Sequence, residues 1–186
     1  MADKIKKLVD LYVEKSKAAG LLNSPVVPDD MVDGNTDEEG WTPWKPIPSS
    51  ISNTEITKLE NKIRTPLPAL FKEYLTYLHI LEFDVGWIRL MALPSDRGIR
   101  EVEHWIFNSH MSDICLENGY VIIGEDGNNA GYLCFDTNSP IRKGLREDID
   151  YPIVLVTHGT KSIVILEEIA RSFEDLVEKI LNKLTE

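Results

Sequence analysis

The sequence predicts an α+β fold: a mixed, mostly antiparallel sheet of about five or six strands packed against helices, with an added amino-terminal helix. Apolar residues recur at helical spacing in residues 3–19, 52–78 and 168–184. Residues 87–166 instead contain short β-branched or alternating segments separated by polar turns. Because helices and strands occupy separate stretches of the chain, the pattern favours α+β over an alternating α/β architecture.

The length and composition of the chain indicate one medium-sized domain with an extension. The chain has 186 residues and a formal net charge of −11. We predict that residues 1–45 form a helix and an acidic extension bearing proline and tryptophan, and that residues 46–186 form the main domain. No apolar run approaches the ~20 residues of a membrane span, and the start of the chain lacks the apolar centre of a secretory signal. These features predict a cytoplasmic protein.

The amino-terminal segment, residues 3–19, predicts an amphipathic helix that ends near Gly20. Its apolar residues include Ile5, Leu8 and Tyr12. We expect this face to dock on the chain's own domain rather than on a partner, since a helical apolar stripe usually packs into a core.

The segment 23–50 breaks regular structure with five prolines. Its acidic residues between positions 29 and 39 have no basic residue among them, and Trp41 and Trp44 follow. Large aromatic side chains are costly to leave in water, so we expect both tryptophans to pin this segment onto the domain. The acidic residues from Asp33 onward do not form an EF-hand calcium loop. Glu38 stands at the sixth position, where the loop requires glycine, and Trp44 stands at the twelfth position, where it requires a bidentate glutamate.

The middle of the chain predicts two helices. Ser52 followed three residues later by Glu55 is a capping box, which marks a helix start. Leu67-Pro68 indicates a second start, since proline is tolerated in a first turn. The final helix is predicted at residues 168–184.

The strands are predicted at residues 87–91, 120–123, 131–135, 151–156 and 162–166. Residues 99–117 fit either a helical face or an irregular edge. Within the central hairpin we expect the first strand to stop at Gly124, with an exposed polar turn after it. Gly159-Thr160 is predicted as the turn between the last two strands.

The polar groups of the hairpin are the main candidates for function. Glu125, Asp126, Asn128 and Asp136 are predicted to be presented at the rim of the sheet. Polar turn chemistry explains them better than paired-carboxylate catalysis does. The four histidines form no motif with a serine or cysteine, and no phosphate-binding glycine loop or paired cysteine motif occurs. We therefore predict no enzymatic activity, no cofactor and no metal.

Four motifs in a fixed order carry a family resemblance. The helical motifs are Ser52-x-x-Glu55-Ile56-x-x-Leu59-Glu60 and Leu67-Pro68-x-x-Phe71-x-x-Tyr74-Leu75; the hairpin motif is Ile123-Gly124-Glu125-Asp126-Gly127 leading to Asp136; the closing motif is Ile169-Ala170-x-Ser172-Phe173-Glu174-Asp175-Leu176. Over about residues 48–180 the chain resembles the SUKH superfamily, which is similar to the yeast Smi/Knr cell-wall synthesis regulator. The resemblance implies binding without a known active site, either as an immunity protein that neutralises a bacterial toxin, often a nuclease, or as a signalling scaffold.

The negative charge narrows the class of partner. It disfavours nucleic acid and anionic membranes and favours a basic protein. With the resemblance, it predicts an immunity protein that occludes a toxin domain; a scaffold in cell-wall or stress regulation is the alternative. The predicted partner-binding residues are Asp37, Glu38, Glu39, Trp41, Trp44, Glu125, Asp126, Asn128 and Asp136.

Overall fold

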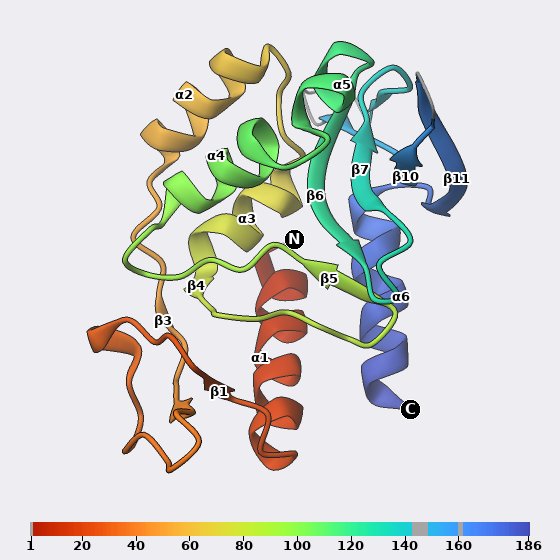
Figure 1. The fold of residues 1–186 in the computed structure, drawn as a ribbon. Coiled ribbons are helices and arrows are strands. Elements are labelled where there is room, and N and C mark those ends of the chain that lie inside the picture. Colours follow the sequence, from red (N-terminus) through yellow and green to blue (C-terminus); the bar gives the residue numbers. More distant parts are fainter. Residues whose placement is uncertain (1, 143–148, 160–161) are drawn as a thin grey trace.

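The computed structural model describes residues 2–142, 149–159 and 162–186, and it has the α+β architecture that the sequence predicts (Figure 1). The described helices are α1 (Ala2–Ala18), α2 (Asn53–Ile63), α3 (Ala69–Tyr77), α4 (Ile99–Asn108), α5 (Ser112–Glu117) and α6 (Phe173–Thr185), with the short 3-10 helix η1 (Asp29–Met31).

The main sheet contains five strands in the order β11-β10-β7-β6-β5, and every pairing in it is antiparallel. These strands are β5 (Ile88–Leu90), β6 (Tyr120–Asp126), β7 (Tyr132–Asp136), β10 (Ile153–His158) and β11 (Ile163–Ala170). Three two-stranded ladders pair the remaining short strands: β1 (Asn23–Ser24) with β2 (Thr42–Pro43), β3 (Ile47–Pro48) with β4 (Leu78–His79), and β8 (Ile141–Arg142) with β9 (Ile149–Asp150).

Alternation along the strands explains why both faces of this sheet are covered. In β6, Ile123 faces the main hydrophobic core, whereas its neighbour Ile122 faces a second cluster that includes Cys115 of α5. Cys134 of β7 also lies in the second cluster. Because successive strand residues point to opposite faces, helices are needed on both sides to bury them.

Helix α1 is an integral part of the main core. Ile5, Leu8 and Tyr12 are at most 5% exposed and belong to the same cluster as residues of α3 and α6. Figure 1 shows α1 beside α6, and the two helices are in contact. The expectation that this helix packs on its own chain is confirmed, and residues 1–45 and 46–186 share one hydrophobic core.

The capping box predicted at Ser52 is present with its expected geometry. The Ser52 hydroxyl accepts the Glu55 N–H at 3.3 Å, and the Glu55 carboxylate accepts the Ser52 N–H at 2.8 Å. These two bonds satisfy amides that a helix start otherwise leaves unpaired. Helix α3 begins at Ala69, with Pro68 as its N-cap.

The strand region differs from the sequence-based expectation in two main details, and one open alternative is resolved there. Residues 99–117 form helices α4 and α5, which resolves the open alternative. Strand β6 continues through Gly124 to Asp126, so the prediction that it stops at the glycine is wrong. Strand β11 extends to Ala170, beyond the predicted end. The predicted turn at Gly159-Thr160 includes a residue outside the described ranges.

Gly124 lies within the strand at a point where the backbone of the neighbouring strand β5 approaches it closely. A Cβ at this position would lie 2.2 Å from the carbonyl oxygen of Arg89 in β5. The register between β6 and β7 also shifts between Ile122 and Gly124. Glycine in a strand often marks a bulge or a close backbone approach, and here it marks both.

No helix among the described residues is both long enough and apolar enough to cross a lipid bilayer.

Candidate functional site

The predicted partner-binding residues lie in three separate places. Residues 37–44 belong to the amino-terminal extension, Glu125 to Asn128 lie at one end of the central hairpin, and Asp136 lies at its other end. Asp126 pairs with Ile88, whereas Asp136 pairs with Tyr120 at the far end of the same strand. At about 3.4 Å per residue, the two aspartates are roughly 20 Å apart. They do not form one continuous surface.

Residues 33–41, called the acidic loop below, are held by hydrogen bonds from one carboxylate. Asp37 Oδ1 accepts the N–H groups of Glu39 at 3.0 Å and Trp41 at 2.8 Å. The Asp37 N–H in turn donates to the Trp41 carbonyl at 2.9 Å. An aspartate that bonds backbone amides a few residues ahead is a typical turn-forming device. Asp37 therefore shapes the loop.

The acidic loop exposes two glutamates and one tryptophan. Trp41 is 44% exposed, and Glu38 and Glu39 are exposed. Within the described part of the chain, neither glutamate forms an ion pair. The expectation that Trp41 is withdrawn from water against the domain is wrong, because 44% of its surface remains exposed.

Trp44 has the opposite environment. It is 2% exposed and belongs to the main core together with Met31 and Leu22. Its backbone N–H donates to the Leu22 carbonyl at 3.0 Å. The expectation that Trp44 pins the segment is confirmed, but a side chain this buried offers no surface to a partner. We remove Trp44 from the predicted contact residues for that reason.

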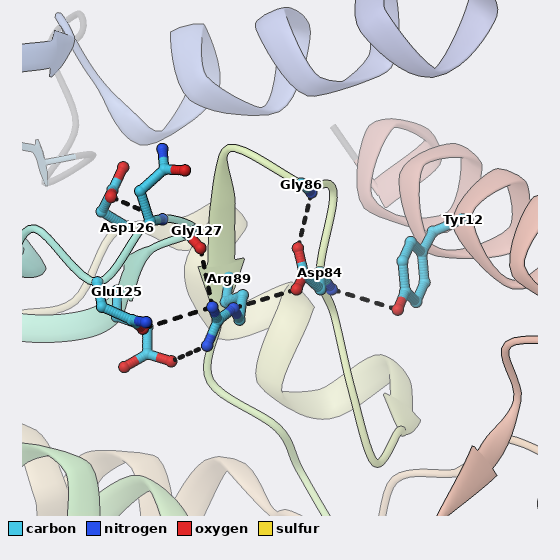
Figure 2. Close-up of polar contacts among 9 residues, drawn as sticks. Tyr12, Asp84, Gly86, Arg89, Glu125, Asp126 and Gly127 are labelled. Carbon is cyan, nitrogen blue, oxygen red and sulfur yellow. Dashed lines mark hydrogen bonds and ion pairs between the residues drawn. The ribbon is translucent and has the colours of Figure 1, made fainter.

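At the hairpin, Arg89 holds several groups in place. Its Nη1 lies 2.7 Å from Glu125 Oε1, its Nη2 donates to the Gly127 carbonyl at 2.9 Å, and its Nε lies 3.1 Å from Asp84 Oδ2 (Figure 2). These side chains are about 30% exposed. Glu125 is thus paired within the molecule, which weakens its attraction for an outside cation.

The same network reaches the amino-terminal helix. The N–H of Asp84 donates to the Tyr12 hydroxyl at 3.2 Å, and Asp84 Oδ1 accepts the Gly86 N–H at 2.7 Å. Figure 2 shows Arg89 between the hairpin and the Asp84 loop, with Tyr12 approaching from α1. Arg89 therefore connects three segments that are distant in sequence. The sequence predicts Arg89 only as a strand residue; the signal for its wider role is a single cation among acid-rich segments.

The other two carboxylates of the hairpin, Asp126 and Asp136, stabilise turns. Asp126 Oδ2 accepts the N–H groups of Asn128 at 2.8 Å and Ala130 at 3.2 Å. Asp136 Oδ1 accepts both the N–H and the side-chain amide of Asn138 at 3.1 Å. Both carboxylates thus satisfy backbone amides, as turn residues commonly do. Asn128 is exposed.

One histidine does contact a serine, which the sequence did not indicate. His79 Nε2 accepts the Ser50 N–H at 2.9 Å and lies 3.0 Å from the Ser50 hydroxyl. Its Nδ1 lies 2.9 Å from the Leu93 carbonyl oxygen, so Nδ1 carries the proton. The Nε2 lone pair is already engaged by a backbone amide, and a carbonyl rather than a carboxylate orients the ring. The arrangement fastens the chain before α2 to β4 and leaves no free base for a nucleophile.

The two cysteine thiols are buried. Cys115 and Cys134 are free thiols with no exposed surface, and burial raises the pKa of the Cys134 thiol well above its usual value. No cluster of three or more histidine, cysteine or acidic side chains in the described ranges is arranged to hold a metal ion.

Removing Arg89 is expected to loosen the hairpin. Arg89→Met leaves Glu125 and Asp84 without their cation in a half-buried position, and we expect a loss of about 2 kcal/mol in the free energy of unfolding. Chemical denaturation followed by circular dichroism measures it. Arg171→Met is the control: its side chain is 84% exposed and 3.9 Å from Asp175, so we expect almost no change. Equal losses in the two variants would contradict the role given to Arg89.

The antiparallel sheet and its packed helices place the described part of the chain in the class of small α+β domains. The family model for the SMI1/KNR4 family (SUKH-1) matches residues 50–179, which is more than half of the chain. The chain therefore belongs to the SMI1/KNR4 (SUKH-1) family. No curated protein matches its sequence. Helix α1 and the acidic loop precede the matched residues.

Proposed function

We propose that this chain is a non-catalytic immunity protein that binds a basic toxin domain through the acidic loop and blocks it by occlusion. One observation carries the proposal: Glu38, Glu39 and Trp41 are all exposed on one short loop that is fixed by internal hydrogen bonds. Membership of the SMI1/KNR4 family and the net charge of −11 support the same assignment.

The two glutamates supply the electrostatic part of the interaction. Neither forms an ion pair with a described residue, so a lysine or arginine of the partner meets them without breaking an existing bond. By contrast, a cation approaching Glu125 competes with Arg89 at 2.7 Å. Complementary charge mainly accelerates association and selects the partner.

Trp41 supplies the apolar part of the interaction. Tryptophan is enriched among residues that dominate binding energy, especially when surrounding polar groups exclude water from it. Since Asp37 fixes the backbone on both sides of Trp41, little conformational entropy is lost when a partner covers the ring. The hairpin turn with Asn128 remains a second, weaker candidate for contact.

The experiment uses the protein encoded beside this gene as the candidate toxin. Its expression alone is expected to arrest growth, and co-expression of this chain is expected to restore it. With purified proteins, Trp41→Ala is expected to raise Kd about 30-fold, and Glu38→Gln with Glu39→Gln to slow association about tenfold at low salt. Rising salt should slow association of the unmodified chain.

The matched control is Glu167→Gln with Glu168→Gln. This variant removes the same charge from two adjacent exposed glutamates on β11, on the other side of the molecule in Figure 1. We expect it to bind at close to the normal rate. If the loop variants and this control behave alike, the acidic loop is not the binding site.

The alternative function is an interaction scaffold in cell-wall or stress regulation. It is favoured by residues 1–49, which precede the family match yet pack against the family domain and add surface to it. A scaffold binds its partner through this added surface but gives no protection from a toxin. Growth restored by co-expression would decide against it.

A further inference from the structure

We propose that the outer edge of β11 binds a second copy of this chain, in a two-fold antiparallel strand pair centred on Val164. Strand β11 is the last strand of the five-stranded sheet, with β10 on its inner side. Figure 1 shows it at the outside of the sheet with no described element beyond it. An edge strand presents unpaired N–H and C=O groups that can pair with another strand.

Three consecutive exposed side chains on this edge are apolar. Val164, Ile165 and Leu166 are 41%, 49% and 48% exposed, and they are consecutive. Edge strands are usually protected from pairing by lysine, proline or very short length. The opposite edge follows that rule, because β5 has three residues and carries Arg89. Residues 163–165 contain no such protection, and the β-bulge of this strand lies at Leu166, just beyond them.

The local register favours a second copy as the occupant. Ile163, Val164 and Ile165 pair in regular order with His158, Thr157 and Val156, and the register shifts only beyond this stretch. In an antiparallel pair, two residues that face each other across the strands point to the same face of the sheet. If the two copies are related by a two-fold axis normal to the sheet, the residue at the axis must therefore face the same residue of the second copy. With Val164 at the centre, Ile163 faces Ile165 of the second copy. The regular stretch is thus self-complementary and wholly apolar.

The acidic end of β11 selects the antiparallel orientation. Glu167 and Glu168 are exposed and follow the apolar stretch. In the two-fold pair the two copies of Glu167 lie about 20 Å apart along the strands, at least twice the Debye length of about 8–10 Å at moderate salt. A parallel pair would place the glutamates of the two copies side by side.

The balance of forces predicts a weak dimer. A short strand pair buries less surface than the roughly 1,200 Å² of a standard stable interface, and two molecules of net charge −11 repel each other. We therefore expect dissociation in the micromolar range, with salt strengthening the dimer by screening the repulsion. Salt is thus expected to strengthen the dimer and to weaken binding of a basic toxin. Because the two expectations have opposite signs, failure of the dimer proposal can be distinguished from failure of the proposed toxin binding.

Sedimentation velocity from about 1 μM to about 300 μM tests the proposal. The unmodified chain is expected to shift from monomer to dimer, and Val164→Lys with Ile165→Lys is expected to raise the dimer Kd at least about tenfold. Val26→Lys is the control, because Val26 is 78% exposed and lies far from β11 in the sequence. A chain that stays monomeric throughout the range would overturn the proposal, also if it binds a basic extended peptide instead. A dimer that survives the double substitution would overturn it as well.

Cross-linking tests the register without depending on the lysine variants. Residues facing each other across antiparallel strands have Cα atoms about 4.5–5.5 Å apart, which suits a disulfide. Val164→Cys treated with oxidised glutathione is expected to give a covalent dimer, whereas Val26→Cys and Glu168→Cys are not. The native thiols Cys115 and Cys134 are buried and do not interfere. Linkage through Glu168→Cys but not Val164→Cys would rule out this pairing.

Discussion

Trp44→Ala is expected to destabilise the protein by about 3–5 kcal/mol, because truncating a buried tryptophan removes apolar contacts and leaves a cavity. Trp44 is 2% exposed and packs in the same cluster as Met31 and Leu22, which hold the extension against the domain. Denaturant unfolding followed by far-ultraviolet circular dichroism measures the loss, since this signal does not depend on the tryptophan that was removed.

The second tryptophan provides the control for this experiment. Trp41 is 44% exposed, so Trp41→Ala is expected to change the free energy of unfolding by no more than about 0.5 kcal/mol while weakening partner binding. Trp44→Phe is expected to cost clearly less than Trp44→Ala, because the Trp44 Nε1 has no hydrogen-bond partner to lose. Similar losses of stability at the two positions would contradict the assignment of one to the core and the other to a contact surface.

Gly124→Ala is expected to cost about 3 kcal/mol, although it adds only one methyl group. The new Cβ would lie 2.2 Å from the Arg89 carbonyl oxygen and 3.1 Å from the Leu90 Cα, and neither is a side-chain atom that can rotate away. Strands β5 and β6 must therefore separate. Since β5 carries Arg89, the contacts of Arg89 with Glu125 and Gly127 should weaken as well.

Gly34→Ala is the matched substitution for this test. Its Cβ would meet only ring carbons of Pro43, the nearest at 3.2 Å, so a small adjustment of one side chain relieves the contact. We expect Gly34→Ala to unfold close to the denaturant midpoint of the unmodified chain and Gly124→Ala well below it. Native-state hydrogen exchange should be faster at β5 and β6 in Gly124→Ala only. Equal midpoints would show that the strand crossing does not explain the glycine.

The central hairpin illustrates how far sequence reasoning reaches. Alternating residues predicted both strands, because a side-chain period of two reflects a local property of the backbone. They did not predict that β6 continues past Gly124, because that depends on β5, about 35 residues earlier in the chain. For a similar reason, the sequence did not decide whether residues 99–117 are helical. Short amphipathic segments acquire their structure from what they pack against.

The two tryptophans show the same limit at the candidate site. They are three residues apart and have the same chemistry, and the sequence predicted the same role for both. Packing separates them, since Trp44 enters the core beside Met31 while 44% of the Trp41 surface remains exposed. The three hairpin carboxylates were predicted to be exposed groups of polar turns. Asp126 and Asp136 do bond to nearby turn amides, but the sequence did not predict that Glu125 pairs with Arg89.

By itself the sequence determined the α+β class, the helix with the Ser52 capping box, the family resemblance and the strongly negative charge. Each of these follows from composition, spacing or bonds between near neighbours, so it can be identified without knowing which distant segments meet. The tertiary structure alone decided which charged and aromatic groups are available to a partner. The physical reason is that burial and ion pairing join residues far apart in sequence, as Arg89 joins Glu125 and as β10 pairs with one edge of β11 while no described strand pairs with the other.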